Sequence, residues 1–122
     1  MNRRIVLLVA LCMIAVSPLF SQPTAEASKG YEIGISKMVS HPALDSIEQG
    51  IMDYLNGTGM QFNFDLQNCN AEIATAIAIA QKFKSDNKDL VVGIATPPAQ
   101  ALAQVITDKP VVFGAITDPL AA

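Results

Sequence analysis

The chain has 122 residues, of which 51% are hydrophobic and 16% are charged, and its formal net charge at pH 7 is −3. This length supports one domain at most, and the apolar fraction is too high for a disordered chain. Nucleic acid is not expected as a partner, because neutralising phosphates needs clustered Lys and Arg, and the two arginines of the chain are Arg3 and Arg4.

Residues 1–27 have the pattern of a secretory signal peptide. The two arginines precede twelve apolar residues at positions 5–16, and Ala25-Glu26-Ala27 fits a small-residue cleavage site. We expect cleavage after Ala27, with cleavage after Ser21 as the alternative. The pattern therefore predicts export across the inner membrane to a periplasmic or extracytoplasmic location.

Two other interpretations of this segment stay open. The apolar run could remain as a membrane anchor, although it is shorter than the ~20 residues that span a bilayer. Cys12 could carry a lipid, although Leu11 stands before it where lipidation signals have a small residue. Residues 28–122 contain six lysines, ten acidic residues and a single cysteine, Cys69, so no disulfide can form within them.

The remaining sequence alternates strand and helix patterns. Residues 31–36 (YEIGIS) predict a strand, and Ser40 is the expected N-cap of a helix with Pro42 in its first turn. Apolar residues on one face of this helix stand at helical spacing, namely Leu44, Ile47, Ile51, Tyr54 and Leu55. Residues 56–59 (NGTG) end it.

The next strand and helix follow the same logic. Residues 62–67 alternate apolar and polar side chains, which predicts a half-exposed strand at a sheet edge. Asn70 is the expected N-cap of the following helix. The expected buried face of that helix is Ile73, Ala76, Ile77, Ala80 and Phe83.

Residues 90–95 (LVVGIA) and 111–116 (VVFGAI) are unbroken apolar runs. Such runs are typical of parallel strands that are covered on both faces. Between them, Thr96 is the expected N-cap of a helix that begins at Pro97. The order β-α-β-α-β-α-β predicts the α/β class, with a doubly wound parallel sheet.

In open α/β sheets, ligands bind beyond the carboxyl ends of the strands. The polar residues at these positions are the candidate ligand-binding residues: Ser36, Asn68, Thr96, Thr117 and Asp118. Thr96 is the most informative of them, since a helix N-terminus favours an anion such as a carboxylate. Each residue also has a purely structural interpretation, as a cap for Thr96 and as a turn residue for Asn68 and Asp118.

No catalytic or metal site is expected. The sequence contains no G-x-G-x-x-G, Walker A, H-E-x-x-H, C-x-x-C or G-x-S-x-G motif. Its one histidine, His41, and Cys69 cannot assemble a typical metal site, and the acidic residues show no convergent pair for acid–base chemistry. We therefore expect a non-enzymatic protein without a cofactor. An α/β hydrolase that uses Ser36 and His41 remains a minor alternative.

Several segments, taken in order, resemble one family. They are residues 33–45 (IGISKMVSHPALD), 49–50 (QG), 67–70 (QNCN), 80–83 (AQKF), 93–101 (GIATPPAQA) and 110–119 (PVVFGAITDP). Together they resemble the bacterial ABC transporter substrate-binding proteins associated with uptake of aromatic amino acids and related solutes. The resemblance runs from about Tyr31 to the last residue.

The resemblance implies a type I periplasmic binding protein, in which two lobes close around a small solute and present it to a membrane permease. It implies ligand contacts from Ser36, Thr96 and Thr117, with a contribution from the loop Met38–Leu44, and an amino-acid carboxylate at Thr96. Residues 28–122 would then be most of the first lobe, without the second. A sensory or interaction module that uses the same lobe is the alternative function.

Overall fold

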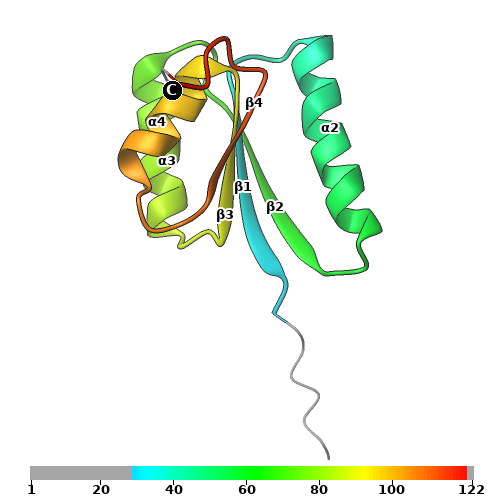
Figure 1. Ribbon diagram of the computed structural model, residues 1–122. Helices are drawn as coiled ribbons and strands as arrows, with labels where there is room; N and C mark the ends of the chain where they lie inside the picture. The colour runs from blue at the N-terminus through cyan, green and yellow to red at the C-terminus, as the bar shows by residue number, and fades with distance from the viewer. Residues whose placement is uncertain (1–28, 121–122) are drawn as a thin grey trace, which may run out of the picture.

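The computed structural model describes residues 29–120, and the signal-peptide pattern, both cleavage sites and Cys12 lie outside them. Strands and helices alternate along these residues (Figure 1). The elements are β1 (Tyr31–Lys37), α2 (Pro42–Gly57), β2 (Phe62–Asn68), α3 (Ile73–Ser85), β3 (Leu90–Ile94), α4 (Thr96–Val105) and β4 (Val111–Gly114). None of the helices within residues 29–120 is both long enough and apolar enough to cross a membrane.

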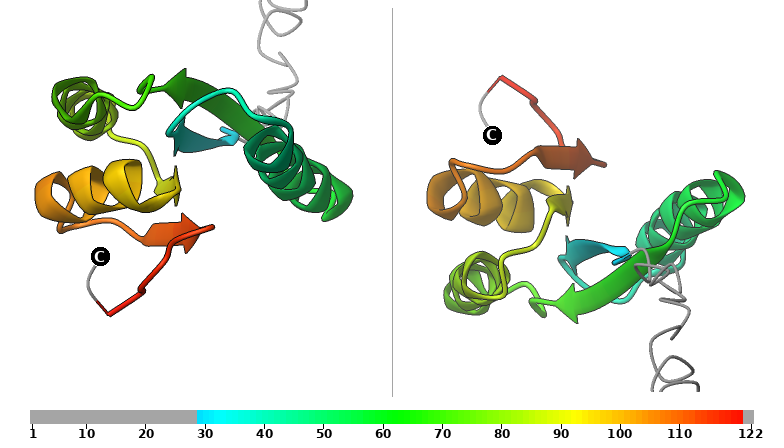
Figure 2. Two further views of the ribbon diagram at one scale, coloured as in Figure 1. Left: turned by 90° about the horizontal axis from the view of Figure 1, so that it is seen from above. Right: turned by 90° about the horizontal axis from the view of Figure 1, so that it is seen from below.

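The strands form one parallel sheet in the order β2-β1-β3-β4. The chain runs outward from β1 to β2 and then returns past β1 to β3 and β4. Because crossover connections are right-handed, the two directions of travel place helices on opposite faces. Figure 2 shows α2 on one face and α3 with α4 on the other. The expected doubly wound parallel sheet is confirmed, and β2 lies at an edge as its alternating pattern predicted.

Each face of the sheet has its own apolar core. On the α2 face, the buried residues are Ile33, Ile35, Val92 and Ile94. On the other face, Phe83 of α3 and Leu102 of α4 are completely buried, together with Val91 of β3. Successive residues of a strand point to opposite faces, so the unbroken apolar run of β3 supplies both cores.

Two glycines let helices approach the sheet closely on the α3 and α4 face. A Cβ on Gly93 would lie 2.5 Å from the Cα of Ala99, and one on Gly34 would lie 2.7 Å from the ring of Phe83. Both distances are too short for real contacts, so the two positions require glycine. Gly93 thereby sets the depth at which α4 rests on β3.

All three helices begin at a different residue from the predicted N-cap. The cap of α2 is His41, whose Nδ1 accepts a hydrogen bond from the Ala43 N–H, while Ser40 contacts β2 instead. The cap of α3 is Glu72, because Asn70 adopts a left-handed conformation two residues earlier. The cap of α4 is Ala95, so that Thr96 is the first helical residue.

Three expectations about burial are also wrong. The prediction that β4 is covered on both faces fails, because Val112 is 46% exposed and Phe113 is 37% exposed at the sheet edge. Tyr54 of α2 is 76% exposed, since no described residue covers the adjacent strip of sheet. On α3, Ile73 is exposed and Ile79 is buried in its place, because the helix packs on a face rotated from the predicted one.

A partly buried ion network joins the end of β1 to α2. The Lys37 Nζ donates to Asp45 Oδ1 at 2.6 Å and to Glu48 Oε1 at 2.8 Å. Both hydrogen bonds raise the pKa of Lys37, and the bond to Asp45 has the larger effect. The sequence had indicated no convergent acidic pair, and here Asp45 and Glu48 converge on a lysine. Glu48 Oε2 is buried and accepts no hydrogen bond within the described residues.

We predict opposite effects for two glycine-to-alanine substitutions. Gly93→Ala should lower the free energy of unfolding by about 2 kcal/mol, because its methyl group would push α4 off the sheet. Gly50→Ala, in the middle of α2 with no atom within 4 Å of the new Cβ, should raise it by about 0.5–1 kcal/mol through helix propensity. Urea unfolding of both variants measures the difference, and equal effects would contradict the close packing at Gly93.

Lys37→Met should lower the free energy of unfolding by about 3 kcal/mol at neutral pH, mainly because it leaves the buried Glu48 carboxylate without its cation, while the half-exposed Asp45 carboxylate contributes less. The raised pKa of Lys37 adds a pH signature: its contribution is complete below the ordinary lysine pKa and is lost as the pH rises through the folded-state value. The difference between wild type and variant should therefore stay constant from pH 7 to pH 9 and shrink above about pH 10.5. Lys29→Met, at an exposed lysine, is the control and should change stability little.

Candidate functional site

The loops that follow the four strands meet at one edge of the sheet, called here the carboxyl edge. The register places Lys37, Ile94 and Gly114 level with one another at this edge. Backbone hydrogen bonds continue past the strand ends, from the Met38 N–H to the Ile94 carbonyl and from the Ala95 N–H to the Gly114 carbonyl. The loops are therefore held at fixed positions on a rigid support.

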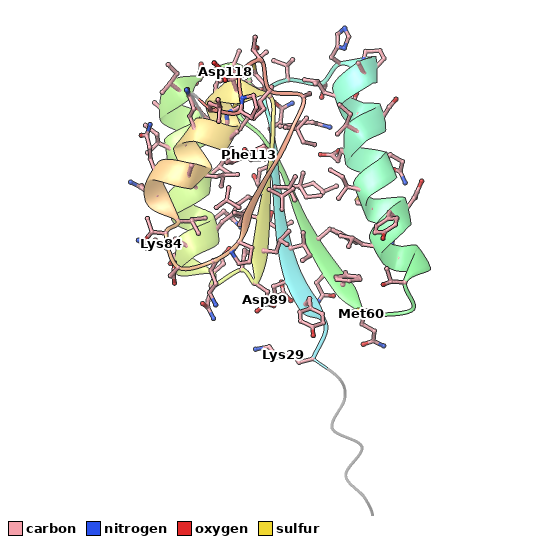
Figure 3. All side chains as sticks on the ribbon, viewed as in Figure 1. Lys29, Met60, Lys84, Asp89, Phe113 and Asp118 are labelled. Atoms are coloured by element: carbon pink, nitrogen blue, oxygen red, sulfur yellow. The ribbon has the colours of Figure 1, made fainter. Side chains whose placement is uncertain are left out.

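Asp118 marks this end of the molecule, and Lys29, Met60 and Asp89 lie at the opposite end (Figure 3). The two ends are separated by the length of the strands. Four of the five candidate residues end or follow a strand on the Asp118 side, and Ser36 is the last residue but one of β1. The parallel sheet therefore brings them to the same end of the domain, as the strand order requires.

Thr96 and Thr117 are the candidate residues that the structure joins directly. The backbone N–H of Thr117 donates to the Thr96 Oγ1 at 3.3 Å. This hydrogen bond links the loop after β4 to the first turn of α4. Thr96 is partly buried and Thr117 is exposed, so the pair lies at the surface of the carboxyl edge.

The first turn of α4 has few hydrogen-bond donors. Pro97 and Pro98 have no N–H, and the Ala99 N–H donates to the Ala95 carbonyl at 3.2 Å. Among the first three helical residues, only Thr96 can offer a backbone donor to a ligand. The expected anion-binding helix terminus is thus reduced to one N–H together with the positive end of the helix dipole.

Asn68 belongs to the other half of the carboxyl edge. Its Nδ2 donates to the Ser40 Oγ at 3.2 Å, and its Oδ1 accepts from the Asn70 N–H at 2.9 Å. The second contact is the Asx turn that the sequence offered as a structural interpretation. The first contact attaches the loop after β1 to the end of β2. Ser40 belongs to the loop Met38–Leu44, which the family resemblance implied as a contributor, although the local sequence pattern assigned Ser40 itself to a helix cap.

Ser36 lies beneath the carboxyl edge. It is only 1% exposed, and its Oγ is buried without a hydrogen-bond partner among the described residues. Gly34, two residues earlier on the same strand, faces Phe83 of α3, so the Ser36 side chain points toward the α3 and α4 layer. An unpaired buried hydroxyl costs about 1–3 kcal/mol, which makes Ser36 an unusual residue at this depth.

Asp118 is exposed, and its Oδ1 accepts a hydrogen bond from the Leu120 N–H at 2.9 Å. This contact forms the turn that the Asp118-Pro119 pair indicated. Carboxylates keep further acceptor capacity after one such bond. Asp118 therefore places a negative charge beside Thr117 at the outer rim of the carboxyl edge.

Strained backbone concentrates at the carboxyl edge. Ala95 and Ala115, the first residues after β3 and β4, have φ values of 80° and 54°, and Asn70 and Ala71 after β2 are also left-handed. Ala95 combines φ 80° with ψ 162°, a region that glycine occupies almost exclusively. Alanine costs of order 1–3 kcal/mol in such a conformation, and strain of this kind clusters at functional sites. The pattern of apolar residues in the sequence did not indicate these strained backbone conformations.

His41 and Cys69, the remaining residues considered from the sequence, have structural roles at this end of the sheet; the Cys69 N–H donates to the Lys37 carbonyl at 3.0 Å. His41 is exposed and caps α2, and it makes no hydrogen bond to the buried Ser36. Cys69 is a free, buried thiol whose pKa is raised by desolvation. Within residues 29–120, no three His, Cys, Asp or Glu side chains are grouped so that they could hold a metal ion.

Comparisons with known proteins show which family this chain resembles. Residues 32–122 match the family model described as ABC transporter substrate binding protein. A tyrosine-binding protein of Clostridioides difficile (strain R20291) is 39% identical over 101 residues, which cover 80% of this chain and 29% of that protein.

Three solved structures are also similar to this chain. A ligand-free, open substrate-binding protein with adhesive properties from Clostridium difficile has a TM-score of 0.71 at 39% identity. A conserved domain protein from Vibrio cholerae has a TM-score of 0.73 at 41% identity. An ABC domain in complex with L-Trp from Streptococcus pneumoniae has a TM-score of 0.70 at 40% identity.

Each of the three structural matches covers 75% of this chain and 32% of the solved one. The chain therefore spans about a third of the length of these relatives. The family match extends over well more than half of the present sequence. This chain belongs to the family of ABC transporter substrate-binding proteins.

Proposed function

We propose that this chain forms one wall of a binding site for a small organic solute, with an amino acid as the best-fitting class. The observation that carries the proposal is the hydrogen bond between Thr117 and Thr96, which joins two strand-end loops at the N-terminus of α4. Hydroxyl groups on a rigid sheet edge beside a positive helix end match the polar part of an amino acid.

An amino-acid zwitterion presents a carboxylate and an ammonium group close together. In the proposed arrangement, the carboxylate accepts hydrogen bonds from the Thr96 N–H and from a threonine hydroxyl, in the positive field of the helix end. We assign the ammonium group to the Asp118 carboxylate, which follows Thr117 directly in the chain and keeps acceptor capacity beyond its bond to the Leu120 N–H. Asn68 and the buried Ser36 complete the set of candidate contacts.

The relatives support the same class of solute. One is named as a tyrosine-binding protein, and another was solved with L-Trp. We therefore propose an aromatic amino acid or a close analogue as the solute of this chain. We further propose delivery to an ABC permease from an extracytoplasmic location, and the family and the signal-peptide pattern of residues 1–27 support this.

A solute-binding cleft needs two walls, and this chain spans about a third of the relatives' length. In our proposal the second wall comes from a second lobe, as the family resemblance implies. One wall leaves most of the ligand in water, so residues 1–122 alone should bind with low affinity. The test must therefore detect weak binding at individual residues.

Titration of the ¹⁵N-labelled full chain with L-tryptophan provides such a test. We expect the largest amide shift changes at Thr96, Thr117 and Asp118. Thr96→Val removes a hydroxyl but keeps the shape, and it should weaken binding about tenfold, as expected for losing one hydrogen bond to a charged group.

Thr107→Val serves as the matched control, because Thr107 is exposed in the loop that enters β4 at the opposite edge, and it should leave binding unchanged. N-acetyl-L-tryptophanamide keeps the indole ring but lacks both charges, and it should produce no shifts at Thr96. Shifts located at the opposite edge, or equal responses to the two compounds, would refute zwitterion recognition at the carboxyl edge.

A further inference from the structure

The strand order reverses direction between β1 and β3, and we call this place at the carboxyl edge the switch point. The chain leaves β1 toward α2 on one face of the sheet and leaves β3 toward α4 on the other (Figure 2). Open α/β sheets bind ligands where the strand order reverses in this way. The switch point is flanked by residues 38–41, called here the β1 loop, and by the turn at Ala95 and Thr96.

The start of the β1 loop is attached to both neighbouring strands by backbone contacts. The Met38 N–H donates to the Ile94 carbonyl at 3.2 Å, and the Met38 carbonyl accepts from the Ala71 N–H at 2.8 Å. The Cys69 thiol also donates to the Met38 carbonyl, at 3.5 Å. Beyond Met38 the chain turns away from the sheet to reach α2, so its path depends on side-chain contacts.

Lys37 connects the two ends of this turn. Its backbone is paired in β1, level with Asn68 on one side and Ile94 on the other. Its Nζ donates to Asp45 Oδ1 at 2.6 Å and to Glu48 Oε1 at 2.8 Å, in the first half of α2. The residue before the β1 loop is therefore bound directly to the helix after it, which restricts the conformations open to the short segment between them.

The Lys37 side chain points away from the proposed contacts of the solute. Ser36 faces the α3 and α4 layer, so the next residue of the strand faces α2. The Lys37 side chain is 12% exposed, and the Glu48 side chain beside it is 10% exposed. With two of its three ammonium N–H groups bound to α2, Lys37 acts on the position of the loop and not on the solute.

We propose that Lys37 is a positioning residue for the solute-binding surface: by tying the end of β1 to Asp45 and Glu48, it holds the β1 loop opposite Thr96 at the switch point. The inference rests on the proposed function, because it concerns the same carboxyl edge. A loop that is ordered before the solute arrives does not have to be ordered by binding, and affinity rises accordingly.

The first experiment needs no solute. Amide ¹⁵N relaxation of the full chain gives order parameters for residues 39–41, and Lys37→Met should lower them from about 0.85 to below about 0.6. Because Lys37→Met also removes stability, Asp45→Asn is the second variant; Asp45 is half-exposed, and its loss should lower the order parameters less. Ile33→Ala is the matched control, because it opens a cavity on the same strand and face at the other end of β1, and it should leave the loop ordered.

The second experiment is titration with L-tryptophan, followed at the Thr96 amide. Lys37→Met should weaken binding about tenfold and Asp45→Asn about threefold. Lys37→Arg keeps a cation between the two carboxylates and should restore most of the affinity. Ile33→Ala should bind as the wild type does.

An ordered β1 loop in Lys37→Met would overturn the proposal, and so would a mobile loop with unchanged affinity. Equal weakening of binding by Ile33→Ala would also overturn it, since lost stability alone would then explain the effect. If the wild-type chain shows no shifts with L-tryptophan, the proposed function fails, whereas the order parameters still decide whether Lys37 positions the β1 loop.

Discussion

The close contact between α4 and β3 is the constraint on which the proposed site depends. Gly93 lets the backbone of Ala99 rest directly on the sheet, and Thr96 stands one turn earlier on the same helix. Because α4 cannot slide without losing this contact, its first turn is held at the carboxyl edge. The hydrogen bond from Thr117 to Thr96 then attaches the loop after β4 to the same point.

The same contact explains the strain at Ala95. The chain must leave β3 and enter α4 within one residue, and Ala95 makes this turn at φ 80° and ψ 162°. Glycine would relieve the backbone cost, although it would also make the turn more flexible. A rigid entry to the helix keeps the Thr96 N–H and hydroxyl in one orientation, which favours a preorganised binding surface.

The two faces of the sheet are packed differently. The α3 and α4 face is closed, with Phe83 and Leu102 fully buried, and it supports the helix end that carries Thr96. The α2 face is held at one end by Lys37, which ties β1 to Asp45 and Glu48, and it is apolar and open at the other. The carboxyl edge lies at the ends of the strands, apart from both faces.

Much of this architecture follows from the sequence alone. Unbroken apolar runs, helical spacing and their strict alternation determined the α/β class, the parallel sheet and the position of β2 at an edge, because these patterns record burial directly. They also placed Thr96 and Thr117 beyond the carboxyl ends of two predicted strands. The family resemblance agreed with these patterns, and the comparisons confirm it.

Tertiary structure decided the rest. The residue that caps a helix depends on the hydrogen bonds that each side chain makes in the fold. The Ser40 Oγ accepts a hydrogen bond from Asn68, and His41 caps α2 instead. The exposure of Tyr54 and Val112 depends on which elements cover the sheet, and the periodicity of apolar residues does not report that. The Lys37 network and the strain at Ala95 depend on how consecutive elements pack against each other, and neither leaves a mark on the local hydrophobic pattern.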